Sequence, residues 1–74
     1  ANNTEILFTL PTDGNVNLKV YNMLGKEVYN ITVAGNTGDN RIPVSAEKLT
    51  SGIYLYTLTY NNTTITKKMI VEKN

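Results

Sequence analysis

Apolar residues recur at every second position in much of this chain, and that alternation constrains its fold more than any other feature. In the clearest case, Val16, Leu18 and Val20 alternate with polar residues. A period of two is typical of strands that bury one face, whereas a helix repeats about every 3.6 residues. Asn and Thr occur 11 times each and suit turns and exposed strand positions. The sequence therefore predicts an all-β protein.

The alternation, interrupted by turn residues, predicts six strands. A seventh strand is also compatible with the pattern. The predicted strands cover residues 5–10, 16–20, 28–33, 41–44, 53–60 and 64–72. Short strands at regular spacing are typical of an antiparallel sandwich or barrel. A chain of 74 residues has room for a single domain. We assign residues 1–74 to that domain, with residues 1–5 as the remnant of a linker.

Four segments between or within the strands have local signatures. Residues 11–15 contain Pro and Asp-Gly, which predict a tight reversal with a positive φ at the glycine. Asn61 and Asn62 predict a two-residue hairpin turn, because Asn tolerates the left-handed conformation. Residues 45–49 have helical leanings, and we expect at most one turn there, bridging two sheets. Pro43 favours an edge strand, because proline cannot donate a ladder hydrogen bond.

The strand over residues 53–60 indicates part of the core. Tyr54, Tyr56 and Leu58 share one face, which we expect to point inward, with Ile53 and Leu55 partly covered on the other face. A buried tyrosine needs a partner for its hydroxyl. Because Tyr54 follows a turn, we expect its hydroxyl to bond back to that turn, as in a tyrosine corner.

The last predicted strand has an apolar face that a lysine interrupts. Ile65, Met69 and Val71 share this face with Lys67. The aliphatic part of Lys67 lies on the rim of the core with its ammonium in water, or Lys67 and Lys68 belong to a recognition strand. Both interpretations stay open.

The composition closes most routes to catalysis and metal binding. Cys and His are absent, which excludes disulfides, thiolate nucleophiles, cysteine zinc sites and imidazole bases. The six carboxylates share no short motif, so we expect no enzymatic activity and no cofactor. Asp13 and Asp39 offer oxygen ligands to calcium, but turn formation explains both residues better. The five tyrosines suit strand packing better than sugar stacking.

Charge and hydropathy limit the partners. The net charge is +1 and Lys67-Lys68 is the only adjacent basic pair, so we expect no nucleic-acid binding. Apolar runs such as residues 69–71 are far shorter than a membrane span of about 20 residues, and the first residues do not resemble a signal peptide. Asn-x-Ser/Thr triplets are a weak glycosylation signal in a sequence so rich in Asn and Thr. They begin at Asn2, Asn30, Asn61 and Asn62.

Three segments, taken together, indicate more about function than any one of them does alone. The turn motif is Leu24, Gly25, Lys26, Glu27 and Val28; the glycine–aromatic motif is Gly52, Ile53 and Tyr54; the terminal motif is Lys67, Lys68, Met69, Ile70 and Val71. In this order and spacing they resemble the type A C-terminal sorting domain of the type IX secretion system. The resemblance extends over residues 6–73, and a chain end three residues after Val71 fits it.

The resemblance implies a small immunoglobulin-like antiparallel β-sandwich without catalytic residues, fused to the C-terminus of a cargo protein. Such a cargo reaches the periplasm by a separate signal, and the sorting domain leads it through the outer membrane to the cell surface or the medium. The implied partners are the cargo and the shuttle, translocon and sortase-like peptidase proteins of the outer membrane. The peptidase commonly removes the domain. We expect the domain itself to be a monomer.

Two other classes are compatible with the sequence. The main alternative is a fibronectin-type or carbohydrate-binding accessory module of a secreted enzyme. A chain end after Asn74 favours sorting over this alternative. A self-associating structural module would need an exposed apolar edge, which Pro43 and the surface lysines disfavour. For the three motifs, direct contact with partners and maintenance of the fold are both open.

Overall fold

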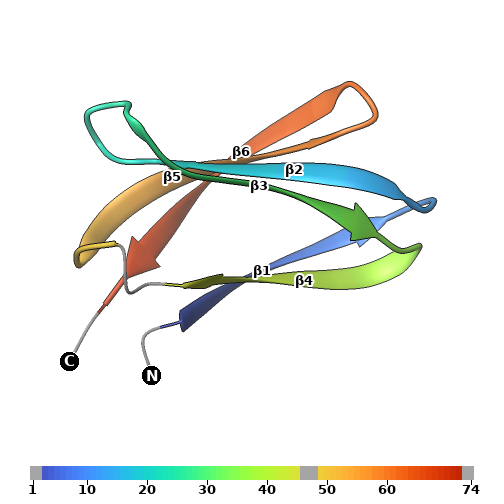
Figure 1. Ribbon diagram of the computed structural model, residues 1–74, viewed down its shortest axis with the longest axis horizontal. Coiled ribbons are helices and arrows are strands. Elements are labelled where there is room, and N and C mark those ends of the chain that lie inside the picture. The colour runs from blue at the N-terminus through green and yellow to red at the C-terminus, as the bar shows by residue number, and fades with distance from the viewer. Residues whose placement is uncertain (1–2, 46–48, 73–74) are drawn as a thin grey trace.

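All regular structure in the described part of the chain is β. The computed structural model describes residues 3–45 and 49–72 (Figure 1). Its strands are β1 (Asn3–Leu10), β2 (Gly14–Tyr21), β3 (Glu27–Gly35), β4 (Gly38–Ser45), β5 (Gly52–Tyr60) and β6 (Thr63–Val71). The structure confirms the all-β prediction, and each predicted strand lies within or close to an observed one.

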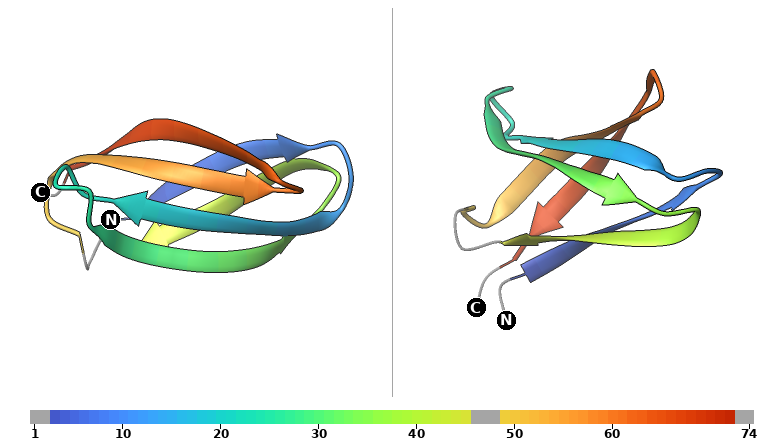
Figure 2. Two further views of the ribbon diagram at one scale, coloured as in Figure 1. Left: turned by 90° about the horizontal axis from the view of Figure 1, so that it is seen from above. Right: turned by 45° about the vertical axis from the view of Figure 1, so that its right-hand side comes forward.

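The strands form two antiparallel sheets that lie face to face as a sandwich (Figures 1 and 2). The larger sheet has the order β3-β2-β5-β6, and the smaller one consists of β1 and β4. The chain passes between the sheets in the connections β1 to β2, β3 to β4 and β4 to β5. β1 begins and β6 ends at the same end of the sandwich (Figure 1).

The core fills the space between the sheets with alternate residues of each strand. Val16, Leu18 and Val20 of β2 are at most 1% exposed, because β2 lies between two neighbours and under the smaller sheet. The buried core consists of Ile6, Leu10, Val16, Leu18, Val20, Ile42, Val44, Leu49, Tyr54, Tyr56, Leu58, Met69 and Val71. It includes the predicted inward face of β5.

The predicted terminal hairpin is confirmed. Tyr60 pairs with Thr63, so Asn61 and Asn62 form a two-residue turn. Their φ angles are 52° and 68°. Positive φ at both positions is the mark of a type I′ turn, whose twist matches that of the flanking strands.

Two sequence expectations need correction. The segment over residues 11–15 connects the two sheets, and its glycine, Gly14, is not among the residues with positive φ. A Cβ at Gly14 would lie 2.8 Å from Cε1 of Tyr60, so close packing explains this glycine. Residues 3–5, assigned above to a linker, belong to β1, where Glu5 pairs with Pro43 and its carboxylate lies 3.6 Å from Arg41.

The edge position predicted from Pro43 is confirmed, since among the described strands β4 pairs only with β1. The expected helical turn over residues 45–49 falls largely on residues 46–48, which lie outside the described part of the chain.

Candidate recognition surface

The three motifs meet at one end of the larger sheet. Tyr21 of β2 pairs with Glu27 on one side and with Leu55 on the other, and Leu55 pairs with Lys68. These residues form a row across all four strands, β3, β2, β5 and β6. Next to this row, Ile53 pairs with Ile70. Segments that are 13 or more positions apart in sequence therefore share one surface region.

The outer face of this region carries apolar side chains beside a lysine. Ile53 is 45% exposed and its cross-strand partner Ile70 is 57% exposed, while Leu55 is 40% exposed. Lys68 is also exposed and pairs with Leu55. We call Ile53, Leu55, Lys68 and Ile70 the outer patch. Leu55 was not among the predicted site residues, although it has the same strand parity as Ile53 and this signal could have found it.

Other motif residues point into the core. Tyr54 and Met69 are each 6% exposed, pair with one another across β5 and β6, and belong to the hydrophobic core. Val71 is 3% exposed. Because side chains alternate between faces along a strand, each motif supplies both core and surface residues. Maintenance of the fold thus explains Tyr54, Met69 and Val71, whereas Ile53, Lys68 and Ile70 are exposed on the surface.

The predicted tyrosine corner is present at the start of β5. The hydroxyl of Tyr54 donates a hydrogen bond of 2.7 Å to the carbonyl oxygen of Thr50. Gly52 has a φ of 156°, and no heavy atom lies within 4 Å of the position that a Cβ would take. Backbone conformation rather than close packing therefore requires glycine at this position of the motif.

Lys67 lies on β6 close to Met69, where the buried positions of that strand begin. It pairs with Tyr56. It is one of the first six residues of β6, all of which are exposed. Ile65, expected on the apolar face, is 42% exposed. β6 pairs with β5 alone among the described strands, so its second edge is open to a further strand.

The turn motif is held by the side chain of Asn22. Its Oδ1 accepts hydrogen bonds from the backbone N–H of Leu24 at 3.0 Å and of Lys26 at 2.9 Å. Two backbone bonds of 2.9 Å, from Asn22 to Lys26 and from Gly25 to Asn22, close the turn, and Gly25 has a φ of 85°. Val28, further along the motif, packs against the core.

Two acidic residues outside the motifs, Asp13 and Asp39, accept hydrogen bonds from threonines. One carboxylate oxygen of Asp13 accepts hydrogen bonds from the backbone N–H of Thr37 at 2.7 Å and from its hydroxyl at 2.9 Å. These bonds lower the pKa of Asp13. The hydroxyl of Thr9 donates to Asp39 at 3.0 Å. Within residues 3–45 and 49–72, no group of three or more acidic side chains is arranged to hold a metal ion.

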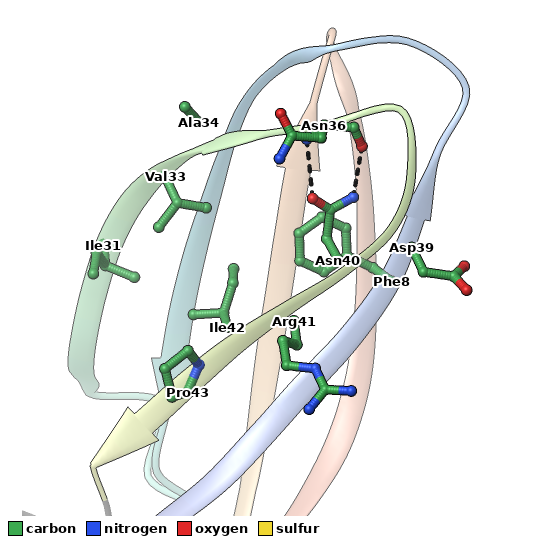
Figure 3. A pocket seen from close by; sticks show the side chains of 10 residues that line it. All are labelled: Phe8, Ile31, Val33, Ala34, Asn36, Asp39, Asn40, Arg41, Ile42 and Pro43. Atoms are coloured by element: carbon green, nitrogen blue, oxygen red, sulfur yellow. Dashed lines mark hydrogen bonds between the residues drawn. The ribbon is translucent and has the colours of Figure 1, made fainter.

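A hollow of about 510 Å³ lies between β3 and β4 (Figure 3). Apolar side chains such as Ile31, Val33 and Ile42 line it. Asn40, also in its wall, accepts a hydrogen bond from the backbone N–H of Asn36 and donates one to the carbonyl oxygen of the same residue (Figure 3). This arrangement fastens the β3 to β4 connection, and it offers no pairing of a nucleophile with a base.

The tyrosines serve packing. Tyr54 and Tyr56 are buried, and the hydroxyl of Tyr60 donates to the carbonyl oxygen of Thr12 at 2.9 Å. Tyr21 and Tyr29 are half-buried. Such positions favour the structural interpretation over a flat aromatic platform for sugars.

Fold and surface together define a small type of domain, an antiparallel β-sandwich whose sequence motifs converge on one exposed end. A family model described as the secretion system C-terminal sorting domain matches residues 2–72. The chain belongs to this family of type IX secretion sorting signals. Membership implies export by that system, interaction with its machinery and a cargo fused on the N-terminal side. Comparison with curated proteins and with solved structures found no match.

The described residues contain no helix that is long and apolar enough to cross a membrane.

Proposed function

We propose that this domain directs its cargo through the outer-membrane translocon of the type IX system, and that the machinery recognises it through the outer patch. The supporting observation is the convergence of three separated motifs on one end of the larger sheet, where Ile53, Lys68 and Ile70 are exposed. Ile53 and Ile70 pair across β5 and β6 while both are exposed, and adjoining exposed apolar side chains are typical of an interaction site.

Three features of this end suit a protein partner. The apolar pair Ile53 and Ile70 gains about 1 kcal/mol for each side chain whose remaining exposed area is buried. Lys68 beside the pair favours an acidic group on the partner. The open edge of β6 offers backbone N–H and C=O groups to an added strand, which is a common way of binding an extended segment.

The remaining steps follow from the same proposal. The cargo crosses the inner membrane by its own N-terminal signal and folds in the periplasm, and the shuttle and translocon proteins bind the domain. A sortase-like peptidase then cuts before the domain, and the cargo is released or attached to the cell surface. The start of β1 lies at the same end of the sandwich as the end of β6 (Figures 1 and 2), the strand that carries Lys68 and Ile70 of the outer patch. This arrangement supports a junction within reach of the bound machinery.

The test fuses residues 1–74 to the C-terminus of a fluorescent reporter that is already exported to the periplasm. The fusion is expressed in a bacterium with type IX secretion and in a matched strain without the translocon. We expect the reporter at the surface or in the medium of the first strain and in the periplasm of the second. A reporter retained in the periplasm of both strains, with the domain folded, would refute the proposal.

A further inference from the structure

The turn between β2 and β3 displays two large apolar side chains. Leu24 is 93% exposed and Met23 is 66% exposed. We infer that Leu24, with Met23 beside it, is an anchor that inserts into an apolar pocket on a protein of the secretion machinery. This inference rests on the proposed function and adds a second contact to the outer patch.

The fold does not account for these two residues. Asn22 and Gly25 supply what the turn requires, namely the side-chain acceptor and the positive φ. Positions 23 and 24 contribute only backbone to the turn, so a polar side chain would fit there equally well. At 93% exposure, Leu24 gains almost nothing from burial in its own domain.

The geometry of the turn suits insertion. Four hydrogen bonds between 2.9 and 3.0 Å hold residues 22–26, two of them to the Asn22 side chain. A preorganised turn loses little conformational entropy on binding, so burial of its side chains is converted efficiently into affinity. Anchors of this kind, an apolar side chain in a fully desolvated pocket, dominate the energetics of many interfaces.

The position of the turn favours a protein pocket over a lipid surface. The turn follows Tyr21 directly, and Tyr21 pairs with Leu55 of the outer patch, so one partner can cover both. Two apolar side chains bury too little area for stable attachment to a bilayer, since even a myristoyl chain alone binds only marginally.

The decisive variant is Leu24→Asn in the reporter fusion described above. Its matched control is Leu7→Asn, because Leu7 is 63% exposed on β1 in the other sheet. A conservative variant, Leu24→Met, keeps the apolar character. We expect Leu24→Asn to lower the secreted fraction about tenfold, as loss of an interface anchor does. Leu24→Met and Leu7→Asn should be secreted like the unchanged fusion.

A purified domain with Leu24→Asn should unfold at the same temperature as the unchanged domain, because the side chain is exposed. Secretion of Leu24→Asn at the unchanged level overturns the anchor while the proposed function stands, and an equal loss with Leu7→Asn also overturns it. If the unchanged fusion itself stays in the periplasm, the proposed function fails. Sedimentation of the domain with phosphatidylethanolamine and phosphatidylglycerol vesicles, if it depends on Leu24, would overturn the protein pocket and show that Leu24 contacts a lipid surface.

Discussion

The hydroxyl of Tyr54 lies 2.7 Å from the carbonyl oxygen of Thr50 and donates a hydrogen bond to it. This bond fixes the start of β5 to the segment that leads into it, across the positive φ of Gly52. Tyr54 also pairs with Met69 of the terminal motif. One tyrosine therefore couples the turn, the core and the strand that carries the outer patch.

Replacing Tyr54 with Phe tests this coupling. We expect Tyr54→Phe to lower the free energy of unfolding by about 1 kcal/mol, the typical net value of one hydrogen bond. In a domain of this size, that corresponds to a fall of about 4–8 °C in the unfolding midpoint. The control is Tyr56→Phe, since Tyr56 is equally buried on the same strand but has no hydroxyl hydrogen bond within the described residues. Equal midpoints for the two variants would contradict the role of the corner.

The Asn61-Asn62 turn predicts opposite effects for two substitutions at one position. Asn62 has a φ of 68°, which costs an alanine about 1 kcal/mol or more and costs glycine almost nothing. Asn62→Ala should therefore destabilise the domain, and Asn62→Gly should leave its stability equal or raise it. Urea denaturation of both variants measures the difference. A more stable Ala variant would exclude the type I′ turn.

Asp13 should make stability depend on pH. The backbone N–H of Thr37, followed by its hydroxyl, holds the pKa of Asp13 below its ordinary value of 3.8. A carboxylate with a lowered pKa in the folded state stabilises the fold above its ordinary value, and this contribution disappears as the pH falls through the folded-state pKa. The midpoint difference between the unchanged domain and Asp13→Asn should be constant near neutral pH and shrink in strong acid. A difference that does not change down to pH of about 2 would refute the assignment.

Local chemistry allowed much of this fold to be predicted from the sequence. Alternation located all six strands, and Asn61-Asn62 predicted the hairpin turn. The position of Tyr54 after a turn predicted its hydrogen bond. Each of these features depends on residues that are close in sequence, where side-chain type and spacing limit the possible conformations.

Features that depend on distant partners were not predictable in the same way. The division into sheets of four and two strands is set by pairing between residues far apart in the chain, such as Ile6 and Ile42. The exposure of Ile65 depends on which part of β6 the rest of the fold covers, which its own sequence does not encode. For the same reason, the motifs could be found from the sequence, but their separation into core and surface residues required the structure.

Recognition through the outer patch is tested most directly by a matched pair of substitutions on β6. Ile70 and Ile65 are 57% and 42% exposed on the same strand, but only Ile70 belongs to the outer patch. Thr keeps the β-propensity of both positions. In the reporter fusion, Ile70→Thr should reduce the secreted fraction severalfold, with an unfolding midpoint close to that of Ile65→Thr, which should be secreted normally. Normal secretion of Ile70→Thr, or an equal loss in both variants, would contradict recognition at this end of the sandwich.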